Sequence, residues 1–330
     1  MKADGSVVTW GHEEFGGDSI SVADKLQEGV VQVTGTNGAF AAIKEDGSIV
    51  TWCIRGGDSS SVADKLEWGV IQVVGNRKAF AAIKEDGCVV TWGHEEFGGD
   101  SPSVADKLED GVVQVTGTNS AFAAIKEDGS VVTWGDGSSG GDSSSVADTL
   151  EWGVVQVVGN RDAFAAIKAG GSVVTWGHEE FGGDSSSVAD KLEDGVVQVT
   201  GIHSASAAIR EDGSVVTWGD GSCGGDSSSV ADKLEWGVVQ VVGNGHAFAA
   251  IKADGSVVTW GEPIGEHSFG GSSTSVADKL EEGVVQIVGN TFAFAAIKAD
   301  GSVVTWGSEE RGGNSSSVAD KLQGGVVQVV

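Results

Sequence analysis

The sequence contains no tyrosine, only two prolines and one methionine among 330 residues, whereas glycine occurs 53 times. So narrow a set of residue types is what repeated copying of one segment produces. No apolar stretch reaches the roughly 18 residues that a membrane span requires, and Met1-Lys2-Ala3-Asp4-Gly5 does not resemble a signal peptide. We therefore expect a soluble protein, cytoplasmic by default, although a domain taken from a longer chain would look the same.

Cysteine is also scarce, and its three copies occupy non-equivalent repeat positions, at Cys53, Cys88 and Cys223. An odd number without the spacing of metal ligands argues against a disulfide framework and against a zinc site. We expect no cofactor and no resident metal.

Positive charge is in short supply, since 20 basic residues face 48 acidic ones and the formal net charge is −28. The average surface should repel DNA, RNA and anionic membranes. The charge therefore predicts no nucleic-acid partner and no membrane partner, and favours a basic or neutral protein if a partner exists.

What the sequence has in abundance is one repeat. The block Val-Val-Thr-Trp, with small variations, occurs eight times at intervals of 42, 40, 42, 42, 42, 42 and 46 residues, and its tryptophans are Trp10, Trp52, Trp92, Trp134, Trp176, Trp218, Trp260 and Trp306. The blocks Ser-Val-Ala-Asp-(Lys/Thr)-Leu and Gly-Val-(Val/Ile)-Gln-(Val/Ile) also occur eight times, but Ala-Phe-Ala-Ala-Ile occurs only seven times. A period of this length is typical of solenoids, propellers and similar arrays.

Each repeat reads as three short strands: Val-Val-Gln-Val, Ala-Phe-Ala-Ala-Ile-Lys and Ser-Val-Val-Thr-Trp. Asp-Gly precedes the third strand in nearly every repeat, as at Asp46-Gly47, and favours a tight hairpin. The strands therefore predict an antiparallel meander. The segment of about 18 residues after each tryptophan suits a crossing to the next meander, with either a fourth edge strand or one helical turn.

The strands are apolar on both faces, because Val7 and Thr9 alternate with Val8 and Trp10. A blade packed between two neighbouring blades needs this pattern, whereas a sheet with one wet face alternates apolar with polar residues. Three or four strands in about 42 residues is the repeat of a propeller, and a β-solenoid has a shorter period. The sequence predicts an all-β fold, a β-propeller of seven to eight blades, each of three to four antiparallel strands, forming a single domain over residues 1–330.

The number of blades is open. Seven repeats are complete, and the eighth is divided between a third strand at residues 6–10 and a first strand at residues 325–330, with no middle strand. Either seven blades close and the ends decorate them, or an eighth blade is completed imperfectly or by another chain. The repeats alternate in type (Trp68 and Trp152 against Glu28 and Asp110), and this pairing favours eight. Unpaired strand edges at the seam between the termini also predict possible self-association.

The run from Gly153 to Gly177 resembles the repeat of the RCC1 (regulator of chromosome condensation) family, with a Val-rich strand, an Ala-rich strand and Gly-Gly-Ser-Val-Val-Thr-Trp-Gly. The resemblance extends over the whole chain and implies a propeller, commonly of seven blades. Members of that family serve as nucleotide exchange factors, ubiquitin-ligase modules, inhibitors and interaction domains, so the fold does not fix the function. The family's usual His in the second strand is missing, Gly-Gly-Asp-Ser at Gly140–Ser143 replaces Gly-Gln-Leu-Gly, and no residue matches an exchange role.

The loop after each tryptophan varies most, and variable loops on a constant frame are where scaffolds bind partners. We identify as possible partner-binding residues His12, Phe15, His94, Phe97, His178, Phe181 and Phe269, although the Phe side chains could equally pack beneath the loops. Loop carboxylates such as Asp136 and Asp142 could be ligands of Ca²⁺, but turn formation explains them more simply.

No nucleophile elbow, phosphate-binding loop or dinucleotide fingerprint is present. The sequence predicts a protein that is not an enzyme: an interaction scaffold that presents variable loops on one face. The alternative is a structural or self-assembling repeat protein with no specific ligand, a class that includes recent or engineered arrays. A nucleotide-exchange regulator is a third hypothesis, but near-identical repeats supply no cluster of unusual residues for it.

Overall fold

The computed structural model describes residues 1–53, 57–261 and 269–329. Its regular elements are strands and short 3-10 helices. The chain forms two compact units, Met1–Phe164 with Trp176–His178, and Ala165–Thr175 with Glu179–Val330. That the whole chain acts as a single domain stays a prediction.

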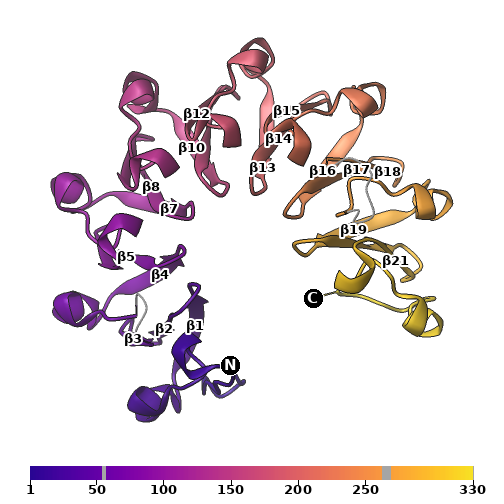
Figure 1. Cartoon of the computed structure of the whole chain (residues 1–330). Helices are drawn as coiled ribbons and strands as arrows, with labels where there is room; N and C mark the ends of the chain where they lie inside the picture. Colours follow the sequence, from indigo (N-terminus) through magenta and orange to yellow (C-terminus); the bar gives the residue numbers. More distant parts are fainter. Residues whose placement is uncertain (54–56, 262–268, 330) are drawn as a thin grey trace. The chain divides into compact units, whose positions relative to one another are not determined.

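Each complete repeat forms one three-stranded sheet, called a blade here and numbered in chain order (Figure 1). Blades 1 to 4 are β1 (Val30–Gly35), β2 (Phe40–Lys44) and β3 (Ile49–Trp52); β4 (Val70–Gly75), β5 (Ala79–Lys84) and β6 (Val89–Gly93); β7 (Val112–Gly117), β8 (Ala121–Lys126) and β9 (Val131–Gly135); β10 (Val154–Gly159), β11 (Ala163–Lys168) and β12 (Val173–Gly177). Blades 5 to 7 are β13 (Val196–Gly201), β14 (Ala205–Arg210) and β15 (Val215–Gly219); β16 (Val238–Gly243), β17 (Ala247–Lys252) and β18 (Val257–Gly261); β19 (Val284–Gly289), β20 (Ala293–Lys298) and β21 (Val303–Gly307).

The predicted all-β, propeller-type fold is confirmed, with seven blades in the described part of the chain. The preference for eight was wrong for these residues, because the two pieces of the eighth repeat belong to no sheet. The reason is physical: a first and a third strand do not pair with each other in this meander, and the eighth repeat has no middle strand to join them.

The strands pair in the predicted antiparallel order, and blade 6 shows the register. Phe248 lies opposite Trp260 and Ala250 lies opposite Val258. On the other side of β17, the register shifts between Val238 and Gln240, so the residue between them, Val239, is the extra residue of a β-bulge. The same shift occurs in β1, β4, β7, β13 and β19.

The apolar core lies between adjacent blades, as the two apolar faces predict. Between blades 1 and 2, Ala39, Ala41 and Ile43 of one blade pack with Phe80 and Ala82 of the next, and each is at most 3% exposed. The middle strand of a blade therefore contributes one face to each of two cores. Small alanines are needed on it because adjacent blades approach closely.

Where the structure describes it, the segment after each tryptophan forms 3-10 helices and no fourth strand, which favours the helical form of the two predicted. The longer helices, which precede the seven blades and follow the last, are η2 (Ile20–Leu26), η3 (Ser60–Leu66), η5 (Pro102–Lys107), η7 (Ser144–Leu150), η9 (Ser186–Lys191), η11 (Ser228–Lys233), η12 (Thr274–Lys279) and η14 (Ser316–Lys321). The shorter ones are η1 (Glu13–Phe15), η4 (Glu95–Phe97), η6 (Gly137–Ser139), η8 (Glu179–Phe181), η10 (Gly221–Cys223) and η13 (Glu309–Arg311). No helix in the described residues has the length and apolar character needed to cross a membrane.

In six of the seven blades, the tryptophan is held by the loop that enters its blade. The indole Nε1 of Trp134 donates a 3.1 Å hydrogen bond to the carbonyl of Gly98, and its ring stacks on Phe122 at 5.4 Å between centroids. Five further blades make the same bond, from Trp52, Trp176, Trp218, Trp260 and Trp306. Gly98 has a φ of +81°, and a Cβ there would be 2.9 Å from the Phe122 ring, so glycine is required at this crossing.

Candidate binding surface

The first and third strands of a blade end at the same edge, so the tip between the first two strands and the loop after the third lie together. We call this the loop edge, and the opposite one, with the Asp-Gly turns, the turn edge. Residues at the tips differ between blades even though the strands barely change: Asn37-Gly38, Arg77-Lys78, Asn119-Ser120, Arg161-Asp162, His203-Ser204, Gly245-His246 and Thr291-Phe292. Both variable segments of each repeat are therefore on one edge.

A single buried asparagine joins the two variable segments in blade 2. The Oδ1 of Asn76 accepts hydrogen bonds from the backbone N–H groups of Lys78 and Ala79 at 3.0 and 2.9 Å, and its Nδ2 donates to the carbonyl of Phe97 at 2.6 Å. Asn244 and Asn290 make the same three bonds in blades 6 and 7. In blade 3, Thr118 performs this role with its hydroxyl, which donates to Ser139 and accepts from Ala121. These bonds fix variable residues on a constant support.

In the first unit the tips form a continuous row. The backbone N–H of Asn37 donates to the carbonyl of Arg77, that of Arg77 to Asn119, and that of Asn119 to Arg161. Three cations, Arg77, Lys78 and Arg161, lie on this row, and Arg161 pairs with Asp162 at 3.2 Å. In a chain with a net charge of −28, this row is locally cationic.

In the second unit the tips carry aromatic side chains, which meet in one cluster. His246 lies 4.9 Å from Phe269 and 5.8 Å from Phe292 between ring centroids, and His203 approaches His246 edge-on at 5.7 Å. The guanidinium of Arg311 lies 5.1 Å from the centre of Phe292. We call these five residues the aromatic cluster. His203 and Arg311 are exposed and the other three are half-buried, so the cluster presents ring surface to solvent.

The residues predicted from the sequence fall on the loop edge but are not brought into one site. His12 and Phe15 pack on each other at 5.3 Å, and His94 and Phe97 do so at 5.2 Å. Phe15 is 49% exposed, whereas Phe97 is half-buried with Lys78 Nζ 4.6 Å from its ring centre. His178 and Phe181 are both half-buried at η8. Of the seven, Phe269 is the one that lies in the aromatic cluster.

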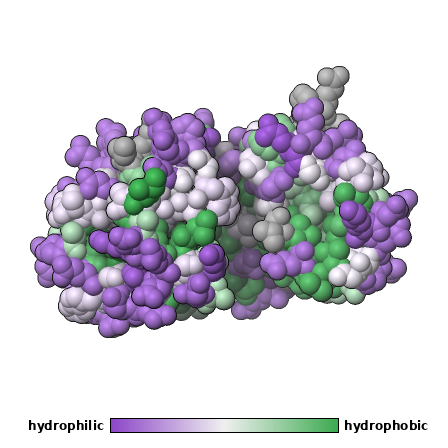
Figure 2. All heavy atoms as spheres, turned by 90° about the horizontal axis from the view of Figure 1, so that it is seen from below, coloured by the Kyte–Doolittle hydropathy of each residue, from purple (hydrophilic) through white to green (hydrophobic). Residues whose placement is uncertain are grey.

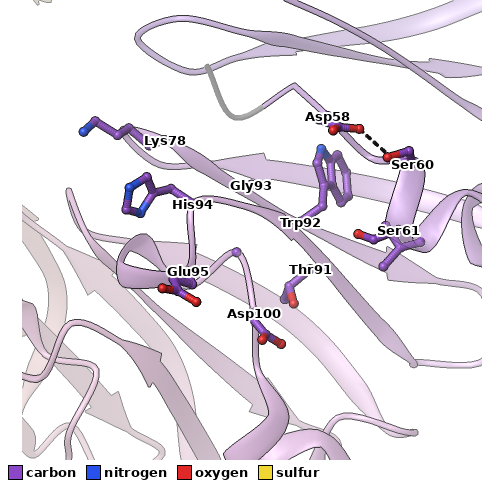
Figure 3. Close-up of a pocket in the computed structure, with 12 residues that line it drawn as sticks. Asp58, Ser60, Ser61, Lys78, Thr91, Trp92, Gly93, His94, Glu95 and Asp100 are labelled. Carbon is purple, nitrogen blue, oxygen red and sulfur yellow. Dashed lines mark hydrogen bonds between the residues drawn. The ribbon is translucent and has the colours of Figure 1, made fainter. Parts of the chain in front are cut away.

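A groove of about 940 Å³ lies beside the outer edge of β6, and its residues include Lys78, His94 and Glu95. Figure 3 shows Lys78 and His94 at one end of this groove and Asp58, Ser60 and Trp92 at the other. Equivalent grooves of 560 to 990 Å³ flank β9, β15, β18 and β21. Because the groove recurs beside five of the third strands, it follows from the repeat geometry.

The loop carboxylates considered for Ca²⁺ are engaged in turns. Asp136 Oδ1 accepts from the N–H groups of Ser138 and Ser139, and Asp142 Oδ1 accepts from that of Ser144 at 2.9 Å. The hydrogen bonds from the Ser144 backbone and hydroxyl lower the pKa of Asp142. Among the described residues, no group of three or more His, Cys, Asp or Glu side chains is arranged to hold a metal ion. Burial raises the pKa of the Cys88 thiol, the opposite of what a reactive cysteine requires.

Sequence reasoning missed the hairpin tips, the joining asparagines and a set of exposed apolar residues. The bulge residues and Val155, which has the equivalent position in β10, are 51–58% exposed: Val31, Ile71, Val113, Val155, Val197, Val239 and Val285. Trp68 and Trp236 are 60% and 64% exposed at the turn edge, each with a lysine Nζ 4.2–4.3 Å from its ring. In Figure 2, hydrophobic residues are visible between the hydrophilic ones that cover much of this view. The tip positions could have been found by aligning the repeats, because they vary next to invariant strands.

No family model matches the chain, and no curated protein sequence matches it. Similar solved structures include the ectodomain of the Physcomitrella patens receptor kinase CR4 (12% identity, 84% of this chain, 72% of that chain, TM-score 0.44). They also include Prp20p, the Saccharomyces cerevisiae RCC1, studied with its binding to Gsp1p and histones (16%, 74%, 72%, TM-score 0.43), and the computationally designed protein Ika8 (12%, 84%, 83%, TM-score 0.38). At these identities and scores, no partner or site can be transferred to this chain.

Proposed function

We propose that this chain is a non-enzymatic interaction scaffold that binds a protein partner at the loop edge of its blades. One observation supports this most strongly: the hairpin tips and the loops after the tryptophans, which vary most between near-identical repeats, gather on a single edge, and an Asn or Thr side chain joins them in blades 2, 3, 6 and 7. The turn edge, by contrast, keeps its Asp-Gly turns in nearly every repeat. Variation concentrated on one edge of a rigid frame is a common arrangement of a recognition surface.

The aromatic cluster is the part of the loop edge best suited to a partner. Half-buried rings beside an exposed arginine are the residue types that contribute most energy at protein interfaces. The formal charge of −28 attracts a basic partner at long range and does not repel a neutral one. The proposed partner is therefore a basic or neutral protein that inserts an apolar or aromatic side chain beside His246 and Phe292.

A structural or self-assembling repeat protein without a specific ligand is the second candidate. The observation that favours it is the regular exposure of the bulge valines and of Trp68 and Trp236, which repeats with the blades and does not single out one place. The two candidates differ in where binding occurs, and this difference can be measured.

The test uses a library of random 12-residue peptides displayed on phage and selected against the full chain. Selected peptides are then measured against the double variant His246→Ala and Phe292→Ser, which gives blade 7 the Ser that follows Asn119 in blade 3. The matched control is Trp236→Asp, which removes an exposed aromatic residue from the turn edge of the same unit and introduces the residue type found at Asp194.

We expect basic and aromatic peptides whose affinity falls at least tenfold with the double variant and is unchanged with Trp236→Asp. Equal loss with both variants, or no loss with the double variant, would place binding elsewhere and overturn the proposal. Light scattering of the full chain tests the second candidate, which requires association that grows with concentration.

A further inference from the structure

The copy of the third strand that belongs to no blade is residues 7–10, at the start of the chain. On its outer side it makes the same contacts as a blade strand. The N–H of Val7 donates to the carbonyl of Leu26 at 2.9 Å, as Val89 does to Leu108 at 2.8 Å in blade 2. The hydroxyls of Thr9 and Ser19 are 2.9 Å apart, as those of Thr51 and Ser59 are in blade 1. The outer contacts of a complete blade are thus already formed.

The inner edge of the same strand has no partner strand among the seven sheets. Trp10 is 83% exposed, whereas the seven blade tryptophans are 1–4% exposed, and Val8 is 53% exposed against 5% for Val50. A Cβ on Gly11 would meet nothing within 4 Å, but one on Gly93 would lie 2.7 Å from the Ala79 Cα of the middle strand. Within the described residues of the first unit, nothing fills the space that a middle strand fills in the blades.

Blade 1 forms the second wall of this space. Val7 packs, where a preceding blade would lie, against a buried cluster formed by Leu26 of η2 and blade 1 residues that include Val30 and Trp52. Phe40 and Val33 on this face are half-buried, whereas their equivalents in blade 2, Phe80 and Val73, are 0% and 3% exposed. The strand edge and the blade face together form an apolar slot, all of it within the first unit.

We propose that this slot binds one extended segment from outside the folded blades, which pairs antiparallel with residues 7–10 and completes the sheet. The proposal is independent of the function proposed for the loop edge. Seven examples of such a segment are present in the chain, the second strands of the blades, and they define its chemistry. Small residues at alternate positions must face blade 1, as Ala39 and Ala41 face blade 2. An aromatic residue between them would stack on Trp10, as Phe40 stacks on Trp52 at 5.3 Å.

The position of the segment follows from the turn before the strand. Lys2 N–H donates to Ser6 carbonyl at 2.8 Å, as Lys44 does to Ser48 at 2.9 Å, so Lys2 takes the place of the last residue of β2. The occupant therefore has the pattern Ala-Phe-Ala-Ala, and its last residue would lie next to Met1. A second copy of the chain offers no such segment among its described residues, because its second strands are buried in blades; Ala79–Ile83, for example, are at most 1% exposed.

The experiment uses the full chain with Trp68→Glu, Trp152→Asp and Trp236→Glu. These changes introduce acidic residues, as at Glu28, Asp110 and Asp194 in other repeats. Among the described residues, Trp10 then remains the one tryptophan that is more than half exposed. The probe is a peptide with the sequence of residues 35–42, Gly-Thr-Asn-Gly-Ala-Phe-Ala-Ala. Two control peptides carry Ser in place of Phe, as at Ser206 in blade 5, or Lys in place of the first and second Ala. A chain with the same eight residues fused before Met1 tests the slot without the cost of association.

We expect the peptide to shift the Trp10 emission to shorter wavelength, to reduce its quenching by acrylamide at least twofold, and to raise the melting temperature. The Ser peptide should bind more weakly than the Phe peptide, and the Lys peptide should not bind. In the Trp10→Ala chain, the Phe peptide should raise the melting temperature no more than the Ser peptide does. The fused chain should show the protection without added peptide. The proposal would be overturned if Trp10 were unprotected in the fused chain, or if the Lys peptide gave the same response as the Phe peptide. It would also be overturned by concentration-dependent dimers that Trp10→Ala abolishes, because the occupant would then be a second copy of the chain.

Discussion

The third strand occurs eight times with almost the same sequence, yet the copy at residues 7–10 and the copies in the blades have different surroundings. Trp134 is 2% exposed, stacks on Phe122 and donates to Gly98, whereas Trp10 is 83% exposed. Val7 and Val89 nevertheless make the same backbone bond to a leucine carbonyl. The contacts on the outer side of the third strand therefore form with the helix that follows it in sequence. The burial of its inner side depends on a second strand about ten residues earlier.

The difference shows that the tryptophan of the third strand is buried only where three segments meet. Those segments are the second strand, which supplies the phenylalanine, the loop of the preceding repeat, which supplies the glycine carbonyl, and the third strand itself. Equivalent residues can therefore be compared directly by substitution.

The largest expected difference is between Trp134→Ala and Trp10→Ala. Removing a buried tryptophan leaves a cavity and should lower the free energy of unfolding by about 3–5 kcal/mol, whereas removing an exposed one should change it by less than about 0.5 kcal/mol. Urea unfolding followed by circular dichroism measures both. Similar losses from the two variants would mean that Trp10 is buried in solution.

Asn76→Ala should have the next largest effect, because it removes the acceptor of two N–H groups and the donor to Phe97. Such loop-capping bonds contribute about 1–2 kcal/mol. The control Asn76→Thr introduces the residue found at Thr118 and should recover part of the loss. Unfolding curves that are the same for the Ala and Thr variants would show that the hydroxyl of Thr118 does not replace the amide.

Ser206→Phe should stabilise blade 5, the blade whose second strand has no aromatic residue opposite its tryptophan, Trp218. A stacked aromatic pair contributes about 0.5–1.5 kcal/mol beyond the area it buries. The melting temperature should rise, and Phe164→Ser in blade 4 should lower it. A fall with Ser206→Phe would mean that blade 5 has closed around the serine, which is 4% exposed, and has no room for a ring.

Gly170→Asp should have the smallest effect, since it restores the Asp-Gly turn that blade 4 lacks. In blade 5, hydrogen bonds from the hydroxyl and the N–H of Ser214 lower the pKa of Asp212. A carboxyl whose pKa is lowered on folding adds stability above its unfolded pKa of about 3.9, and this stability is lost as the pH falls through the folded value. The melting temperature of the variant should therefore be slightly higher than that of the parent at pH 7, and the two should be equal at pH 2. A gain that persists at pH 2 would contradict the role of the charge.

Much of the fold could be predicted because its signals are local. Alternation of apolar residues on both faces predicted strands between neighbouring blades, and Asp-Gly predicted the hairpins. The helical turn after each tryptophan could not be separated from a fourth strand, because Ser-Val-Ala-Asp-Lys-Leu has no clear period and forms a 3-10 helix that ends in a buried leucine.

The candidate surface was predicted only in part, from the loops after the tryptophans. Phe269 was identified, but His203, His246, Phe292 and Arg311 were not, because they are neighbours only through the packing of adjacent blades. The pairing of His12 with Phe15 and of His94 with Phe97 lies within four consecutive residues, so it is local, whereas the tip residues meet only across blades.

The sequence by itself determined the strands, the turns, the period and the presence of seven middle strands for eight third strands, since each depends on residues close together in the chain. Only the tertiary structure decided which side chains of different repeats meet and which equivalent residues stay exposed. The physical reason is that burial in a repeat protein depends on the neighbouring repeat: Trp10 and Trp134 lie in the same local sequence, and the presence of the adjoining strand makes one exposed and the other part of the core.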